Sequence, residues 1–182
     1  MSGQRLLATL GMTMLAAASK FSQLGALPGE HNVGIVLRRA TILLVEDNLN
    51  EAELAIQALE SHQLAGHLAW APTGRIALDF LFRRGVYAAR ERHEPPRLVL
   101  LDLKLPRLDG FEVLAQIRGS PDTQHIPVVI LSSSSEPDDI ARSYDLGANS
   151  YITKPVEFEK FAGLLGEIAR YWLSFNRPPD ER

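Results

Sequence analysis

The sequence predicts an α/β protein built on a doubly wound parallel sheet, and three observations support that fold class. Short apolar runs alternate five times with amphipathic segments between residues 41 and 175. The apolar runs are rich in aliphatic residues, as strands buried on both faces are. The segments between them are long enough for the crossover helices that parallel strands require. This alternation therefore predicts right-handed crossovers and helices on both faces of one sheet.

The expected elements follow in chain order. Strands are expected at 41–46, 67–71, 98–102, 127–132 and 150–153, and helices at 48–62, 76–82, 110–118, 138–146 and 156–175. The helix that begins near Asn48 has an Asn/Asp cap. Residues 83–97 are charged and contain prolines, so we expect a solvated connection there, with a partner-contacting surface as the alternative.

Composition limits the function classes. The 182 residues are 46% hydrophobic and 23% charged, which is typical of a soluble globular domain. A formal net charge of −3 gives no reason to expect binding to nucleic acid or to an anionic membrane. The sequence contains no cysteine, which excludes disulfides, thiolate zinc sites and cysteine nucleophiles. We expect a cytoplasmic protein that binds neither nucleic acid nor membrane.

Three segments divide the chain. Residues 1–39 are expected to be an N-terminal extension, flexible or partly helical, residues 40–176 the domain, and residues 177–182 a tail. Residues 1–19 have Arg5, an apolar run and small residues at the end, which is the outline of a secretory signal peptide. That run is too short and too interrupted for a transmembrane helix, and a start codon assigned too early is a further alternative.

Polar side chains occupy the carboxyl ends of the expected strands. Glu46 and Asp47 end the first strand, Asp102 the third, Ser132 the fourth and Lys154 the fifth. Each residue alone has an ordinary explanation as a helix cap, a turn residue or a surface lysine. The carboxyl ends of parallel strands meet at one edge of the sheet, however, so the five side chains are expected in one cleft.

Such a cluster is suited to phosphoryl transfer. Three close carboxylates repel one another unless cations neutralise them, and Lys154 supplies only one positive charge. Mg²⁺ suits an all-oxygen site that retains several waters. The metal and the lysine would neutralise phosphoryl oxygens, a carboxylate would attack in line, and a hydroxyl would donate to a third oxygen.

Four ordered motifs resemble the receiver domains of two-component response regulators. They are LLVEDN (43–48), LLDLKLPRLDG (100–110), VVILSSS (128–134) and NSYITKP (149–155). The resemblance covers about residues 40–173 and implies a flavodoxin-like (βα)5 sheet of strand order 2-1-3-4-5. It implies a response regulator, not an enzyme, that a sensor histidine kinase phosphorylates and that signals through protein–protein contacts. DFLFRRG (79–85) and YWLSFN (171–176) resemble the stand-alone receivers linked to bacterial phytochrome kinases.

The same resemblance implies roles for the acids and the lysine. Asp102 matches the phosphoacceptor, and Lys154 matches the lysine that acts with it. Asp47 matches a direct ligand of Mg²⁺, and Glu46 matches the acid that acts through metal-bound water. The backbone carbonyl of Lys104 falls where the family supplies a further metal ligand.

Two residues match the family's switch. Ser132 matches the switch hydroxyl, and Ser133 and Ser134 are rival candidates. Tyr151 matches the aromatic residue whose rotamer reports activation, and an ordinary half-buried strand tyrosine is the alternative. Gly110 is expected at a positive φ in the loop beside Asp102.

Two further expectations concern the last third of the chain. The peptide between Lys154 and Pro155 is expected to be cis, which would aim the ammonium into the cleft. The aromatic end of the last helix indicates a homodimer through the fourth helix, fifth strand and fifth helix. The alternative is that Trp172 and Phe175 fold back onto their own domain.

Rival functions make different demands on the same positions. A haloacid-dehalogenase-type phosphatase needs a second Asp where the chain has Lys104. A flavodoxin-like cofactor binder needs a phosphate-cradling loop after the first strand, where Glu46 and Asp47 would repel phosphate. A receiver-like scaffold that is never phosphorylated stays open, although the set of Asp102, Ser132 and Lys154 argues against it.

Overall fold

The computed structural model describes residues 41–63, 68–90 and 95–178. The expected N-terminal extension, the signal-like run within it and the last four residues of the chain lie outside these ranges. In the ranges described, no helix combines the length and the apolar character that crossing a membrane requires.

Five parallel strands form one sheet in the order β2-β1-β3-β4-β5, so the predicted fold class and strand order are confirmed. The strands are β1 (Ile42–Val45), β2 (Leu68–Ala71), β3 (Leu98–Leu101), β4 (Val128–Ser132) and β5 (Ser150–Thr153). Every residue of the central strands β1 and β3 is buried, because helices cover both faces of the sheet.

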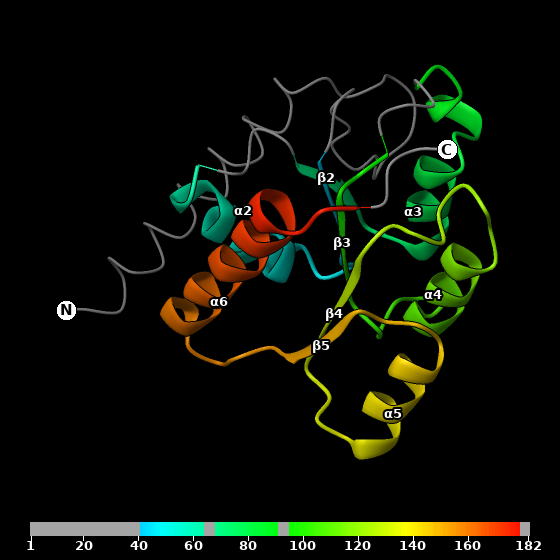
Figure 1. Cartoon of the computed structure of the whole chain (residues 1–182). Coiled ribbons are helices and arrows are strands. Elements are labelled where there is room, and N and C mark those ends of the chain that lie inside the picture. The colour runs from blue at the N-terminus through cyan, green and yellow to red at the C-terminus, as the bar shows by residue number, and fades with distance from the viewer. Residues whose placement is uncertain (1–40, 64–67, 91–94, 179–182) are drawn as a thin grey trace.

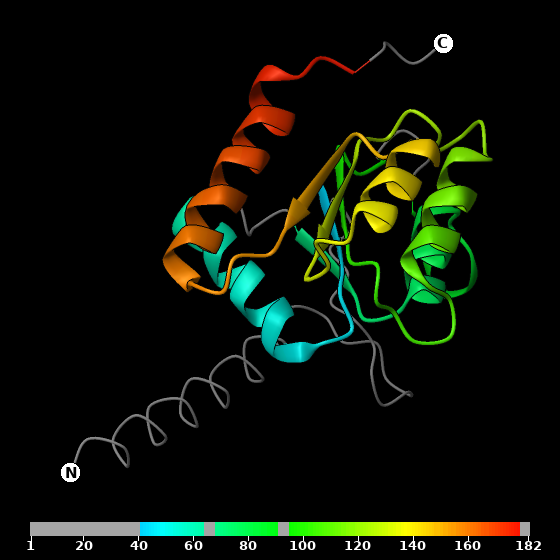
Figure 2. The same cartoon turned by 90° about the horizontal axis from the view of Figure 1, so that it is seen from below.

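The helices lie in two layers around the sheet (Figures 1 and 2). They are α2 (Leu49–Ser61), α3 (Gly74–Leu81), α4 (Gly110–Arg118), α5 (Pro137–Asp145) and α6 (Phe158–Arg170). Helices α2 and α6 cover one face, and α3, α4 and α5 cover the other. Alternate residues of β1 supply the two cores: Ile42 and Leu44 face α2 and α6, whereas Leu43 and Val45 face α3 and α4.

The described part of the connection after α3 is mostly exposed, as expected, but Tyr87 and Arg90 attach it to the domain. A 3₁₀ turn, η2 (Gly85–Tyr87), buries Tyr87 against the ring of Phe80. The guanidinium of Arg90 lies 3.6 Å from the centroid of the Phe80 ring and also donates to the Phe80 carbonyl at 2.8 Å. This part of the connection is therefore anchored to the domain by packing and by a cation–π contact.

The end of the chain divides its aromatic residues between the core and solvent. Helix α6 passes into a π-helical turn, η3 (Tyr171–Phe175). Trp172 packs against the core under α2 and α6, so the alternative that Trp172 and Phe175 both fold back is met for Trp172 and not for Phe175. Tyr171 and Phe175 remain 53% and 61% exposed.

The expected positive φ at Gly110 is wrong. Among the glycines described, φ is positive at Gly85 and Gly147. Gly110 is needed for a different reason: a Cβ at this position would overlap the carbonyl oxygen of Asp102 and the Cα of Leu103. The loop that follows Asp102 folds back so closely that only a hydrogen fits there, and the Gly110 N–H donates to the Leu103 carbonyl at 2.9 Å.

Candidate functional site

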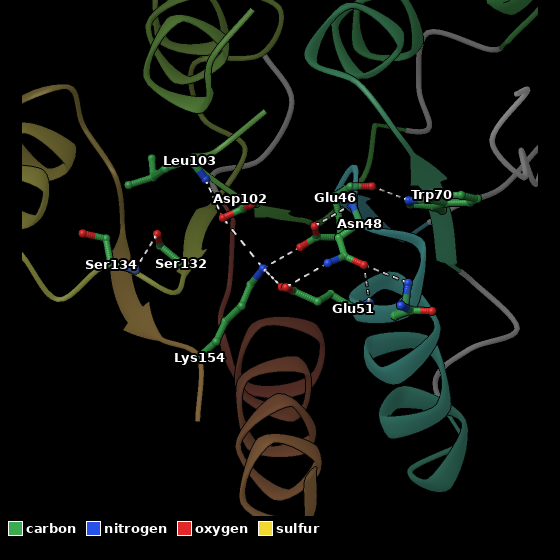
Figure 3. A network of polar contacts seen from close by, with 10 residues as sticks. Glu46, Asn48, Glu51, Trp70, Asp102, Leu103, Ser132, Ser134 and Lys154 are labelled. Atoms are coloured by element: carbon green, nitrogen blue, oxygen red, sulfur yellow. Dashed lines mark hydrogen bonds and ion pairs between the residues drawn. The ribbon is translucent and has the colours of Figure 1, made fainter. Parts of the chain in front are cut away.

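Three acids meet where β1 and β3 end, and Figure 3 shows two of them, Glu46 and Asp102. Val45 and Leu101 are partners in the register of the two strands, so Glu46 and Asp102 leave the sheet side by side. Carboxylate oxygens of Glu46, Asp47 and Asp102 all lie within 4.8 Å of one another. Glu46 and Asp102 are buried and Asp47 is exposed, so the cluster can be approached from solvent. This donor set fits a hard divalent cation.

Lys154 joins the acids from the end of β5. Its backbone N–H donates to the Ser132 carbonyl at 2.8 Å, which fixes the chain where the strand ends. Its Nζ lies 2.5 Å from Glu46 Oε2 and 3.7 Å from Asp102 Oδ1. The expected cis peptide before Pro155 is wrong, because no peptide bond in the described ranges is cis. The ammonium reaches the cleft with a trans peptide, so the pairing of β5 with β4 is sufficient to aim it.

Glu51 is a member of the site that the sequence analysis missed. Its Oε2 lies 2.6 Å from Lys154 Nζ. The side chain of Asn48 caps α2 by accepting from the backbone N–H groups of Asn50 and Glu51. A helix that starts directly after the acidic pair must place its first turn at the same edge, and this was the signal available in the sequence.

Burial and charge shift the pKa values of the site. Burial raises the pKa of Glu46 from 4.5 to about 7, against the opposing effect of Lys154. Burial also raises the pKa of Asp102, although Lys154 and the backbone N–H groups of Leu103 and Lys104 oppose the rise. Burial lowers the pKa of Lys154, but Glu46 and Asp102 outweigh it and the net shift is upward. The ionised forms of Glu46 and Asp102 are therefore disfavoured chiefly by burial, and a bound cation would stabilise them.

The loop after Asp102 wraps around its carboxylate. The Leu103 N–H donates to Asp102 Oδ1 at 2.8 Å, and the N–H of Lys104 also hydrogen-bonds this carboxylate. The Lys104 side chain is exposed. The role of its carbonyl as a metal ligand stays a prediction.

The serines after β4 differ in what they contact. Ser132 is fully buried, and its Oγ accepts from the Ser134 N–H at 3.1 Å. The hydroxyl of Ser134 donates to Asp139 at 2.6 Å and so braces the start of α5. Ser133 is exposed. Ser132 is thus the serine placed at the strand end, where its carbonyl accepts from the Lys154 N–H. Its role as the switch hydroxyl stays a prediction.

Tyr151 is half-buried and packs against the α3 and α4 core. Its hydroxyl donates to the Ser134 carbonyl at 3.0 Å. The tyrosine on β5 is therefore linked directly to the loop that leaves Ser132.

A groove of about 250 Å³ lies beside the acids, between α2 and the loop from β5 to α6. Leu54 and Val156 line it and are among the exposed large apolar residues of the described ranges. Lys154 lines the same groove, so an apolar surface lies directly beside the charged cluster.

Comparison with known proteins agrees with this geometry. The model of the response regulator receiver domain family matches residues 42–165. The probable methanogenesis regulatory protein FilR2 of Methanothrix harundinacea is 45% identical over 138 residues, which are 76% of this chain and 86% of FilR2. Response regulator Rcp1 of Synechocystis is 39% identical over 132 residues, which are 72% of this chain and 88% of Rcp1.

Solved structures show the same fold with ligands relevant to the cluster. The phosphorylated cyanobacterial phytochrome response regulator RcpA superposes with a TM-score of 0.71 at 39% identity, covering 78% of this chain and 99% of RcpA. An Mn²⁺-bound form of Rcp1 superposes with a TM-score of 0.68 at 37% identity, covering 76% of this chain and 97% of Rcp1. Receivers of this kind bind divalent metal through acidic residues and are signalling proteins, not enzymes. The chain belongs to the response regulator receiver domain family, and it is similar to the receivers that serve phytochromes.

Proposed function

We propose that this protein is a single-domain response regulator that accepts a phosphoryl group from a histidine kinase on Asp102, with Mg²⁺ bound. One observation carries the proposal: the buried Asp102 carboxylate lies within 4.8 Å of two further acids, and the Lys154 ammonium lies 3.7 Å from it. A phosphoryl group on Asp102 would thus have two cationic partners close by, a metal ion held by the acids and the Lys154 ammonium. A scaffold that is never phosphorylated would have no use for this set of groups.

Asp102 is the nucleophile in the proposed reaction. One of its oxygens forms a bond to phosphorus in line with the bond that breaks, and the donor imidazole leaves with that electron pair. The Lys154 ammonium pairs with one phosphoryl oxygen, and the Ser132 hydroxyl donates to another. Each of these groups stabilises charge that is spread over the phosphoryl oxygens in the transition state.

The metal would be held by Asp47, Asp102 and the Lys104 carbonyl, and it would neutralise phosphoryl oxygens when bound. Both oxygens of Glu46 already have protein donors, since Oε1 accepts from the Asn48 N–H at 3.0 Å and Oε2 from Lys154. This occupancy supports a role for Glu46 through metal-bound water.

The proposed partner is a sensor histidine kinase of the phytochrome type, in the cytoplasm. The relatives named as phytochrome response regulators support the choice of kinase class. The apolar groove beside Lys154, with Leu54 and Val156 exposed, offers a contact surface next to the phosphoacceptor.

We further propose that the protein acts through protein contacts and not through nucleic acid. We also propose that it forms a homodimer through α5, β5 and α6.

Phosphotransfer profiling tests the proposal. Purified histidine kinases of the host are charged with labelled ATP and mixed with the protein for short times. Rapid transfer of label from a phytochrome-type kinase to the wild type, and none to Asp102→Asn, is expected. If every kinase labels a known partner but none labels this protein, the scaffold function replaces the proposed one.

A further inference from the structure

The phosphoryl transfer proposed above leaves one short contact of Lys154 without a role. The ammonium lies 2.6 Å from Glu51 Oε2 but 3.7 Å from Asp102 Oδ1. The Lys154 side chain is only 11% exposed, so this is a largely enclosed contact on the lysine's side. Figure 3 shows dashed lines from the ammonium to Glu46, Glu51 and Asp102, and the two glutamates are the nearer partners. In this state the lysine is nearer to Glu46, which follows β1, and to Glu51 of α2 than to Asp102.

The Glu51 carboxylate is held in place from its other side. Its Oε1 accepts from Asn48 Nδ2 at 3.2 Å, while Asn48 Oδ1 caps the helix. Glu51 also lies in the first turn of α2, where the helix dipole favours a negative charge. The carboxylate is thus preorganised to receive Lys154 and does not depend on the lysine to define its position.

Glu51 is also close enough to Asp102 for its charge to act there. Its carboxylate contributes to the raised pKa of Asp102, although burial is the larger cause. A phosphoryl group on Asp102 would carry about two negative charges in place of the single charge of the free carboxylate. Such a group would be repelled by Glu51 and would need the ammonium that Glu51 binds.

We propose that Glu51 is a positioning residue that holds Lys154 away from Asp102 in the unphosphorylated protein and competes with the phosphoryl group for its ammonium. This inference rests on the proposed function, because it concerns the same lysine and the same acceptor. Glu51, which lies outside the acidic pair of Glu46 and Asp47, would then influence how tightly an anion is held on Asp102. Phosphorylation then requires Lys154 to exchange one carboxylate partner for the phosphoryl oxygens.

The test uses beryllofluoride, which mimics a phosphoryl group on a carboxylate, at saturating Mg²⁺. Its dissociation constant is measured by NMR titration of the full chain as wild type, Glu51→Gln and Glu53→Gln. Gln keeps the shape of Glu51 but removes its charge, so affinity should rise about threefold to tenfold. Glu53 lies on the same helix and undergoes the same charge change, and it makes no contact with Lys154, so its variant should match the wild type.

Two further measurements separate positioning from a general structural effect. Asn48→Ser keeps a good helix cap but removes the amide that holds Glu51, so it should shift beryllofluoride affinity in the same direction by a smaller factor. Mg²⁺ affinity without beryllofluoride should fall or stay constant in Glu51→Gln, because removing a negative charge cannot attract a cation. Competition for Lys154 should give tighter anion binding without tighter cation binding. The effect of Asn48→Ser, which keeps the Glu51 charge, separates this competition from direct repulsion of the anion by Glu51.

The outcomes distinguish this inference from the function on which it rests. If the wild type binds beryllofluoride and Glu51→Gln binds it equally or more weakly, the competition is refuted and the proposed function stands. If the wild type does not bind beryllofluoride at all with Mg²⁺ present, both are overturned.

Discussion

Ser132 and Tyr151 are joined through one residue, Ser134. The Ser134 N–H donates to Ser132 Oγ at 3.1 Å, and the Ser134 carbonyl accepts from the Tyr151 hydroxyl at 3.0 Å. A change in the hydrogen bonding of Ser132 Oγ therefore alters the environment of Ser134, which binds the Tyr151 hydroxyl. Two hydrogen bonds thus link the end of β4 to Tyr151 on β5.

The first prediction concerns this connection. When beryllofluoride binds with Mg²⁺, Ser132 Oγ should turn toward it, so the Ser134 amide signal and the Tyr151 ring signals should both shift in NMR spectra. In Ser132→Ala the Ser134 N–H has already lost its acceptor, and the ring signals should move much less. Equal ring shifts in wild type and Ser132→Ala would show that the tyrosine responds by another route.

Gly110 supports the second prediction. Gly110→Ala should lower the free energy of unfolding by about 1–3 kcal/mol, because the added Cβ meets the backbone of Asp102 and Leu103, which no rotamer change can relieve. Gly163 is the matched control, since a Cβ there has nothing within 4 Å. Gly163→Ala should raise stability by about 0.5–1 kcal/mol through helix propensity. Urea unfolding curves measure the free energy of unfolding of both variants. A Gly110→Ala variant as stable as the wild type would contradict the close approach of the Asp102 and Leu103 backbone to Gly110.

The third prediction is a pH dependence of stability in the metal-free protein. The pKa of Glu46 rises from 4.5 to about 7 on folding, so the folded state binds this proton more tightly than the unfolded state. Stability from this group is therefore fully present below about pH 4.5 and is lost as pH rises toward about 7. The difference between the two pKa values corresponds to about 3 kcal/mol in the free energy of unfolding.

Glu46→Gln is the control, since Gln imitates the protonated acid and does not titrate. With a chelator present, the stability of Glu46→Gln relative to wild type should increase between about pH 4.5 and about pH 7, by up to about 3 kcal/mol. A difference between the two proteins that is constant over this range would mean that Glu46 does not titrate there.

The fourth prediction concerns self-association. Tyr144, Tyr171 and Phe175 are 51%, 53% and 61% exposed on or next to α5 and α6. If these side chains form the proposed homodimer, Tyr171→Ser with Phe175→Ser should give a monomer by sedimentation at tens of micromolar, where the wild type is a dimer. Trp172 is left unchanged because it packs into the core. A wild type that is monomeric with and without phosphorylation would remove the support for a dimer.

The central strands were predictable because buried parallel strands consist of apolar residues in unbroken runs, and β3 was found at Leu98–Leu101, within one residue of its expected bounds. Helix boundaries were less predictable where apolar residues lie outside the core. Val156 is apolar but fully exposed, and α6 begins only at Phe158, two residues after the expected start. Side-chain periodicity does not show that a proline and an exposed valine belong to the preceding loop.

The acids and Lys154 were predictable because topology alone brings strand ends together. Glu51 was not predicted, since its role depends on the direction in which the first turn of α2 presents its side chains. Gly110 was identified for the wrong reason. The close approach of its backbone to Asp102 and Leu103 is a tertiary contact, which the residues next to Gly110 in the sequence do not indicate. The Lys154–Pro155 peptide was mispredicted because a family resemblance was applied to a position where strand pairing already determines the lysine's direction.

Intact-mass measurement after incubation with Mg²⁺ and a small acyl-phosphate donor tests the central claim most directly. The wild type should gain one phosphoryl group, and Asp102→Asn, which preserves the shape of the side chain, should gain none. A chelator or Asp47→Ala should prevent or greatly slow the gain, because the metal would lose its place beside the acceptor. A phosphoryl group that appears equally in Asp102→Asn, or a wild type that gains none, would contradict the assignment of Asp102 as the phosphoacceptor.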